Sequence, residues 1–574
     1  MSRTTTVAKY LFTRLHQRGI RSVYGVPGDF TLKSLDHLKA SGLKWIGNCN
    51  ELNAGYAADG YSRMRGLSAL LTTYGVGELS AINAVAGSYA EDVPVVHIVG
   101  TPQWHVQQSG AKVHHTLGDG RSRVFAEVHK EFTVAQANLL DPVKAPEMID
   151  DVIEKCMIHS KPGYIEMPCD MVPKEVSTER LETYVLKDRV EGTIQSEEEQ
   201  VEVLLKRLYS ARQPLLLVDR GDGVQHSIKS KINEFVCMTG IPTLTLPSGA
   251  GMIDHTIPNY FGVNAGPVGQ IDTLPYVESS DFVIAFGPLN SDTQTLGWKV
   301  VPDPAKTVTI GGTFITHGAP AQTIGINAEA LMKKLLEKVD RNQINAADTT
   351  SLGNFRTITT PPLKPNELDN PIDQTTFYLR LNQYLRPNDV VLLSNGTPIL
   401  GGRDFVLPSG AQVIASGMWF SIGHMLPAAL GAATAQQEAD PNSRTILIDG
   451  DGNVQVSIQE ISTIIRQRLN MTIFIVDNGG YAYERQIHGM NEEYNDLAPW
   501  RYLDAANFFG AGMPGNEGYP VDTFRISTWS DLETFLAEER FNDGKGLKLV
   551  EVVVGKYDVP EKFKQVFRAA GERL

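Results

Sequence analysis

The 574-residue sequence is poor in cysteine, carries no surplus of positive charge and contains no long apolar run. A net charge of −14 excludes the basic face of a nucleic-acid-binding protein, and no stretch approaches the roughly 20 apolar residues that span a bilayer. The cysteines lack the CxxC spacing of zinc sites and suggest no disulfide framework, so we expect a reducing compartment, the cytoplasm. These absences leave small-molecule chemistry as the expected function. The four cysteines are Cys49, Cys156, Cys169 and Cys237.

Apolar strands alternate with helical stretches along the chain, as in VYGV, LLTTY, VVHIVG and YIEMP. This order predicts an α/β fold of doubly wound parallel sheets covered by helices, and the length suits about three domains. A charged break at residues 190–200 and a polar, proline-ended stretch divide the chain. We therefore predict three domains, at 1–189, 201–340 and 368–574, with a linker at 341–367.

The N-terminal segment is basic and amphipathic, as a transit peptide could be. Val7, Leu11 and Leu15 nevertheless form an apolar stripe at helical spacing that leads directly into the first strand. We favour a core-facing helix of the first domain.

The segment at residues 446–481 carries the most informative pattern in the sequence. An apolar strand runs into the tripeptide GDG around Asp451, an amphipathic stretch follows, and a second apolar strand ends just before Asn478. Because parallel strands open on the same edge of a sheet, we expect these two side chains to meet there. Two side-chain oxygens and a turn carbonyl suit Mg²⁺ completed by phosphate oxygens, and the helix N-terminus offers N–H groups to the phosphates. The sequence predicts a joint metal and diphosphate site.

The tripeptide alone is a weak signal, because GDG recurs at 118–120 and at 221–223. The copy around Asp222 is a true rival, since it follows an apolar strand and precedes a helical stretch and another strand. The spacing from Asp451 to Asn478, counted forward from Asp222, ends at Gly249, which has no side-chain ligand atom. Only the copy at Asp451 has the complete pattern.

The GDG motif with its spaced asparagine resembles the cofactor motif of thiamine diphosphate (ThDP) enzymes. YERQIHG at 483–489 resembles the 2-oxo acid decarboxylases of the pyruvate, indolepyruvate and phenylpyruvate branch, as do GVPGDF at 25–30, NELNAGYAADGYSR at 50–63 and His114-His115. One departure is Asp477-Asn478, where the family usually has two asparagines. The family's metal ligand is the second of the pair, which is retained.

The resemblance implies ThDP and Mg²⁺ as cofactors and three domains that bind the pyrimidine, form a middle layer and bind the diphosphate. It also implies active sites between subunits, and hence a homodimer or a dimer of dimers. The implied metal ligands are Asp451, Asn478 and Gly480. The implied cofactor contacts are Glu51, Gly396, Thr397, Ile422, Gly452 and Asn453.

By itself, Glu51 at the start of a helix would suggest an ordinary favourable charge in a first turn. The resemblance implies that it hydrogen-bonds N1′ of the aminopyrimidine and promotes proton removal from C2. Ile422 matches the apolar wedge under the bent cofactor.

Adjacent histidines in a loop are usually solvated, but the resemblance gives His114 and His115 a role in proton transfer together with Asp29 and Glu484. Decarboxylation needs such groups, since a carbanion must be protonated and an alkoxide must lose a proton. His97, inside a strand, is instead predicted to be a satisfied core residue.

The expected substrate pocket departs from the pyruvate-specific pattern at two positions. Thr293 stands where pyruvate-specific relatives tend to have Phe, which would widen the cavity, whereas Tyr483 replaces Ile or Val and would fill it or add a hydroxyl. A larger, aromatic or branched 2-oxo acid is favoured over pyruvate. The apolar wall is expected to come from Ile399, Leu400 and Ile487.

The sequence thus predicts a ThDP- and Mg²⁺-dependent carboxy-lyase that converts a small 2-oxo acid into an aldehyde. A carboligase that forms an acyloin would carry the same motifs. A non-catalytic ThDP-binding regulator would not need the proton-transfer groups. An NAD or flavin enzyme is not favoured, since G-x-G-x-x-G does not follow the first strand of the middle domain.

Overall fold

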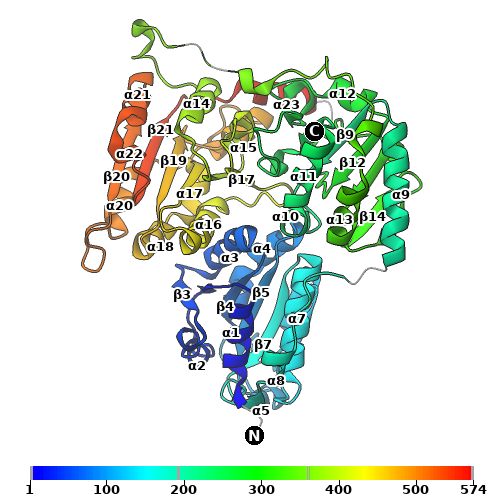
Figure 1. The fold of residues 1–574 in the computed structure, drawn as a ribbon. Helices are drawn as coiled ribbons and strands as arrows, with labels where there is room; N and C mark the ends of the chain where they lie inside the picture. The colour runs from blue at the N-terminus through cyan, green and yellow to red at the C-terminus, as the bar shows by residue number, and fades with distance from the viewer. Residues whose placement is uncertain (1–3, 191–193, 359, 361, 571–574) are drawn as a thin grey trace. The chain divides into compact units, whose positions relative to one another are not determined.

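A computed structural model describes residues 4–190, 194–358, 360 and 362–570 (Figure 1). The chain forms two compact units. The first comprises Met1–Arg189, Leu426–Pro441 and Gln459–Gln467, and the second comprises Val190–Met425, Asn442–Ile458 and Arg468–Leu574.

The first unit is built on a six-stranded sheet in the order β3-β2-β4-β5-β7-β6, with every neighbouring pair parallel. The strands that were predicted from apolar runs are present as β2, β4, β5 and β7. Their side chains are buried, which explains why they read as continuous apolar runs. The strand bounds are β2 Ser22–Gly25, β3 Lys44–Gly47, β4 Ser68–Thr73, β5 Val95–Thr101, β6 Gln136–Asn138 and β7 Gly163–Pro168.

The predicted N-terminal helix is confirmed as α1 (Val7–Gln17), which starts at the Thr6 cap and buries Val7, Leu11 and Leu15. His97 on β5 is a core residue as predicted, because it is fully buried and its Nε2 pairs with Thr72 Oγ1 at 2.9 Å. Its Nδ1 has no hydrogen-bond partner among the described residues, so only one of the two ring nitrogens is hydrogen-bonded.

Two helices from the C-terminal third, α16 (Met425–Ala439) and α18 (Glu460–Gln467), contribute to the first unit. Glycines allow α16 to approach α3 (Glu51–Arg65) closely: a Cβ at Gly60 would lie 2.0 Å from the Ala428 carbonyl oxygen, and one at Gly431 would lie 1.9 Å from that of Ala57. Any larger residue at either glycine would push the helices apart.

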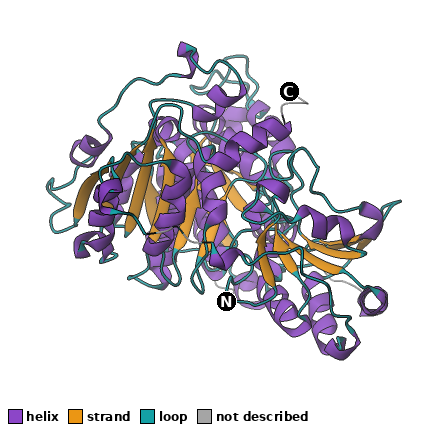
Figure 2. Cartoon of the chain, turned by 90° about the horizontal axis from the view of Figure 1, so that it is seen from above, coloured by secondary structure: helices purple, strands orange, loops and turns teal. Residues whose placement is uncertain are grey.

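The second unit contains two sheets, and helices accompany their strands (Figure 2). One has seven strands in the order β11-β10-β9-β12-β13-β14-β15, and the other has six parallel strands in the order β17-β16-β18-β19-β21-β20. The α/β fold class is confirmed. The bounds are β9 Pro214–Val218, β10 Thr243–Thr245, β11 Tyr260–Val263, β12 Phe282–Phe286, β13 Thr307–Ile310, β14 Phe314–His317, β15 Gln322–Gly325, β16 Val390–Leu393, β17 Gln412–Ala415, β18 Thr445–Gly450, β19 Met471–Asp477, β20 Val521–Ile526 and β21 Leu547–Val553.

The sheet that contains β9 is parallel as far as β13, and β14 and β15 extend it with antiparallel pairs. Only residues 311–313 separate β13 from β14, and a parallel pair would need a crossover of a dozen or more residues. In the stretch 341–367, predicted as a linker, Ile344 and Phe355 are buried in the core of this sheet.

The amphipathic stretch after the GDG motif consists of two helices, α17 (Asp451–Ser457) and α18, with Ile458 between them. Ile461, Ile464 and Ile465 form the buried face of α18. The flanking strands β18 and β19 are parallel and adjacent, as predicted, so their carboxyl ends bring the GDG turn beside Asn478.

Candidate active site

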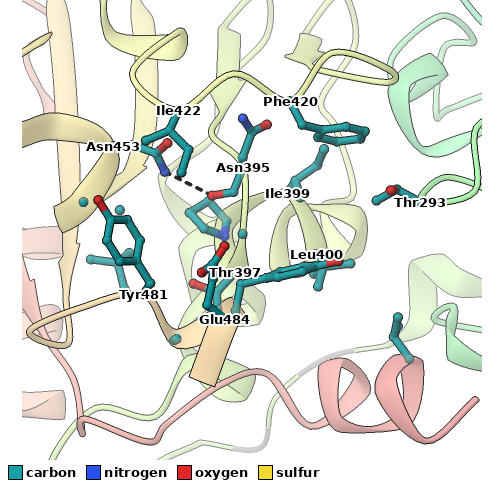
Figure 3. Close-up of a pocket in the computed structure, with 18 of the residues that line it drawn as sticks. Thr293, Asn395, Thr397, Ile399, Leu400, Phe420, Ile422, Asn453, Tyr481 and Glu484 are labelled. Carbon is teal, nitrogen blue, oxygen red and sulfur yellow. Dashed lines mark hydrogen bonds between the residues drawn. The ribbon is translucent and has the colours of Figure 1, made fainter. Parts of the chain in front are cut away.

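A cavity of about 500 Å³ opens at the carboxyl ends of β16, β18 and β19, where ligands bind in open parallel sheets (Figure 3). All of its lining residues belong to the second unit. One end carries carboxylate and amide groups, and the other is largely apolar. The lining includes Thr293, Asn395, Gly396, Thr397, Ile399, Leu400, Arg403, Phe420, Ile422, Asp451, Gly452, Asn453, Asn478, Gly480, Tyr481, Tyr483, Glu484 and Val566.

The predicted metal ligands converge on one turn. Asp451 Oδ2 accepts the N–H groups of Asn478 at 3.2 Å and Gly480 at 2.9 Å, and Asn478 Oδ1 accepts the same Gly480 N–H at 3.2 Å. Both side-chain oxygens therefore lie within 3.2 Å of one amide nitrogen. Such a set of hard oxygen donors fits Mg²⁺, which favours carboxylate and carbonyl ligands.

Electrostatics at this turn favour a bound cation. Burial raises the pKa of Asp451 to about 7, and the nearby negative charge of Asp477 contributes to the rise. Asp477 stands where the family usually has asparagine, so this chain has one more carboxylate beside the predicted metal site. A cation here would stabilise the Asp451 carboxylate.

The diphosphate side of the cavity is formed by asparagines and glycines that sequence reasoning only partly identified. Asn453 Nδ2 donates to the Asn395 carbonyl oxygen at 3.1 Å, as drawn in Figure 3, and its Oδ1 accepts the Gly423 N–H at 3.3 Å. Asn395 Oδ1 is buried and has no hydrogen-bond partner among the residues that the structure describes. Gly396, in the left-handed region at φ 96°, has open space where a Cβ would be, before α15 (Thr397–Gly401) begins. An orphaned polar atom and an open turn suit a polar ligand group.

Two further residues of this turn were missed. A Cβ at Gly452 would lie 2.5 Å from the Tyr481 ring, so that ring lies directly against the GDG turn. The buried Arg485 donates to the Gly479 carbonyl at 3.0 Å and to Asp496 at 2.6 Å, which fixes the turn from behind. A lone Arg in a helix has no periodic signature that distinguishes this role.

Glu51 opens α3 in the first unit. Asn50 caps the helix by accepting the Asn53 N–H at 2.8 Å, so Glu51 is not needed as a cap. A Cβ at Gly77 would lie 3.2 Å from Glu51 Oε1, which shows how closely α4 (Val76–Ala90) approaches this carboxylate. Glu51 therefore begins the helix but does not cap it.

Asp29, His114 and His115 form one cluster in the first unit. One ligand atom from each side chain lies within 4.8 Å of the others, and His114 Nε2 pairs with Asp29 Oδ2 at 2.8 Å. The His114 ring stacks on Phe30 at 5.1 Å, and Tyr74 donates its hydroxyl to the His114 carbonyl at 2.9 Å. The exposed fractions are 52% for the Asp29 side chain and 56% for that of His114, so both are accessible to a ligand.

The remaining predicted residues belong to the second unit. Glu484 and Tyr483 on α19 (Ala482–Ile487) both line the cavity, and the Tyr483 ring packs edge-on against Phe563 of α23 (Glu561–Ala570) at 5.0 Å. Thr293 lies across the cavity from Tyr481 (Figure 3). Ile487 is 45% exposed and is not among the lining residues, because it sits at the far end of α19.

Comparison with known proteins identifies the family. Sequence models of the thiamine pyrophosphate enzymes match in three places: the N-terminal TPP-binding domain at residues 5–121, the central domain at 201–333 and the C-terminal TPP-binding domain at 403–552. A pyruvate decarboxylase of Aspergillus parasiticus is 42% identical over 97% of this chain and 96% of its own length. The chain belongs to the ThDP-dependent 2-oxo acid decarboxylases.

Two other relatives are also similar to this chain over nearly its whole length. This chain is 40% identical to a pyruvate decarboxylase of Aspergillus fumigatus, over 99% of this chain and 97% of the relative. It is 34% identical to pyruvate decarboxylase isozyme 3 of Saccharomyces cerevisiae, over 97% of this chain and 96% of the relative. ThDP is therefore its cofactor, and the chemistry of the family is that of a carboxy-lyase.

The residues of this chain fit the cofactor. The oxygen donors at Asp451 and Asn478 would hold the cation, the open turn at Gly396 would face the diphosphate, and Ile422 projects into the cavity. None of the described helices has the length and apolar content that crossing a bilayer would require.

Proposed function

We propose that this chain decarboxylates a 2-oxo acid without oxidation and releases an aldehyde and CO₂. The observation that carries the proposal is that the chain has both the cluster of Asp29, His114 and His115 and a cavity whose residues fit ThDP and Mg²⁺. A regulator that only bound ThDP would have no use for such exchangeable groups.

When bound, ThDP supplies the electron sink for carbon–carbon bond cleavage. Glu51 would share a proton with the aminopyrimidine ring, a role that a carboxyl group can fill and an amide cannot. The apolar side chains of Ile399, Leu400 and Ile422 would exclude water from the reacting carbon.

Proton transfer falls to His114, His115, Asp29 and Glu484. The pair of His114 and Asp29 can pass a proton over 2.8 Å, and the cavity-lining Glu484 can meet the substrate carboxylate or the developing hydroxyl. Mg²⁺ would be bound by Asp451, Asn478 and the Gly480 carbonyl, supported by their convergence on one turn.

The preferred substrate is a 2-oxo acid larger than pyruvate. Thr293 lines the cavity with a short side chain, and the ring of Tyr483, which also lines it, packs edge-on against Phe563. The relatives carry the name pyruvate decarboxylase, so pyruvate remains the reference substrate. Phenylpyruvate is the aromatic acid of choice for comparison.

The assembly we propose is a homodimer or a dimer of dimers in which each active site combines the first unit of one subunit with the second unit of another. Exposed apolar side chains support it on both units: Val76 and Leu79 on the first, Ile422 and Val456 on the second. The four cysteines are all free, which supports work in a reducing compartment such as the cytoplasm.

The test is to supply purified protein with ThDP and Mg²⁺ and to quantify aldehyde and acyloin from pyruvate, phenylpyruvate and branched 2-oxo acids. We expect aldehyde as the main product. Acyloin as the main product would show that a carboligase is the correct assignment.

A further inference from the structure

The cavity wall that carries Thr293 has an unusual backbone. Three consecutive residues, Leu296, Gly297 and Trp298, have φ values of 53°, 63° and 64°. The left-handed region is unfavourable for leucine and tryptophan, and such strain persists only where the surroundings fix it. All three residues line the cavity, so the contacts around them must hold this part of its wall.

A buried carboxylate lies behind this wall. Asp219, directly after β9, is fully buried and accepts four hydrogen bonds. Its Oδ1 accepts the Ser248 hydroxyl at 2.6 Å and the Arg220 N–H at 2.9 Å. Its Oδ2 accepts the Leu289 N–H at 3.0 Å and the Gln294 amide at 3.5 Å. The last two donors belong to the segment that leads into the strained wall.

Gln294 extends the contacts of Asp219. Its Oε1 accepts the Ser248 N–H at 2.7 Å, and its Nε2 donates to the Leu289 carbonyl at 2.7 Å. Gln294 is 2% exposed and does not line the cavity, although it lies between the cavity-lining Thr293 and Leu296. It therefore acts on the cavity only through its neighbours.

The same network supports a second wall, at residues 416–422. A Cβ at Gly417 would lie 2.8 Å from Gln294 Nε2 and 2.9 Å from Ser248 Oγ, so this backbone rests directly on the network. The Ser291 hydroxyl donates to the Gly417 carbonyl at 2.7 Å. This wall carries Phe420, whose φ of 50° is again left-handed, into the cavity.

We propose that Asp219 and Gln294 are positioning residues that set the substrate preference of the cavity, because they hold its two strained walls in place. The inference rests on the proposed function, since it concerns which 2-oxo acid the cavity admits. Burial raises the pKa of Asp219 to about 6, so at neutral pH the group is still the carboxylate that its four donors require.

Two variants and one control test the inference. Asp219→Asn keeps the size of the side chain but has only one acceptor oxygen for donors on both sides. Gln294→Met keeps the volume and removes all three hydrogen bonds. The control is Asp281→Asn, since Asp281 also accepts two backbone N–H groups, from Arg212 and Gln213, at the opposite end of β12.

We expect both variants to change the ratio of kcat/KM for phenylpyruvate to that for pyruvate at least about tenfold, the scale of a small misfit in a pocket. Hydrogen exchange in peptides covering 289–300 should become faster, ThDP affinity should stay within about twofold, and the control should match wild type. Folded variants that keep the wild-type ratio of the two kcat/KM values would overturn the inference. If Asp219→Asn does not fold, the result for Gln294→Met alone tests it.

The experiment also separates this inference from the proposed function. A wild-type protein that releases aldehyde from no 2-oxo acid would refute the proposed function by itself. In that case unchanged exchange at 289–300 in both variants would also overturn the role of Asp219 and Gln294, and faster exchange would support it.

Discussion

Replacement of Asp451 should remove cofactor binding by a mechanism that can be separated from loss of fold. Its buried carboxylate accepts the N–H groups of Gly452, Asn478 and Gly480 at 2.8, 3.2 and 2.9 Å. In Asp451→Ala the N–H groups of Gly452 and Asn478 lose this acceptor, whereas the Gly480 N–H keeps Asn478 Oδ1. At about 1–3 kcal/mol for each buried unpaired donor, these two cost roughly 2–6 kcal/mol of folding free energy. Asp451→Asn keeps one oxygen and the volume, so it should cost about half as much.

The cofactor gives the second readout. A ligand at 100 times its Kd stabilises the folded protein by about 2.7 kcal/mol, which appears as a higher Tm. Wild type and the control Asp281→Asn should show this rise with ThDP and Mg²⁺. Asp451→Asn should unfold at the same temperature with and without them, because an amide is a poor substitute for the charged ligand of the cation.

Thermal unfolding of the four proteins, each with and without ThDP and Mg²⁺, is the assay, with bound ThDP measured after gel filtration. If Asp451→Asn retained ThDP with near wild-type affinity, the metal assignment would be wrong. If apo Asp451→Ala were as stable as wild type, the hydrogen-bond argument would be wrong instead.

Three further predictions concern proton transfer, substrate size and pH. Glu51→Gln should keep the fold and much of the ThDP affinity but slow hydrogen–deuterium exchange at C2 of bound ThDP severely; wild-type exchange would refute the role of Glu51. Thr293→Phe should lower kcat/KM for phenylpyruvate on the order of 10- to 200-fold more than for pyruvate, and Tyr483→Ile should alter the choice among bulky acids; an unchanged ratio in both would show that neither residue lines the substrate's path. Burial raises the pKa of Glu78, which accepts the Tyr164 hydroxyl at 2.7 Å, from 4.5 to about 7. The folded state therefore binds this proton more tightly than the unfolded state. The contribution of Glu78 to the free energy of unfolding is fully present below pH 4.5 and is lost as the pH rises from there through 7. Glu78→Gln should gain stability relative to wild type by on the order of 2 kcal/mol between pH 5 and pH 8, measured by denaturation at both values; a constant difference would contradict the pKa.

The sequence predicted the elements that depend on local patterns. Buried parallel strands read as apolar runs, so β2, β4, β5, β18 and β19 were expected where they occur. The pairing of β18 with β19 then followed from the strand-helix-strand order, which placed Asp451 beside Asn478.

The remaining features depend on contacts between distant segments. The packing of α16 on α3 relies on Gly60 and Gly431, and a glycine in a helix gives no indication of its partner. Asp219 acts from the loop after β9 and Arg485 is a lone arginine in α19, so no periodicity marks either role. Ile487 lies one helical turn beyond the cavity-lining Tyr483, yet it is 45% exposed and does not line the cavity, so its place in the substrate wall stays a prediction.

The most direct measurement of the central claim is the product balance of the purified protein with ThDP, Mg²⁺ and a single 2-oxo acid. We expect one aldehyde and one CO₂ for each acid consumed, with no oxidant required and with activity lost in Glu51→Gln. Consumption of the acid without stoichiometric aldehyde, or no consumption of any 2-oxo acid by protein that retains ThDP, would contradict it.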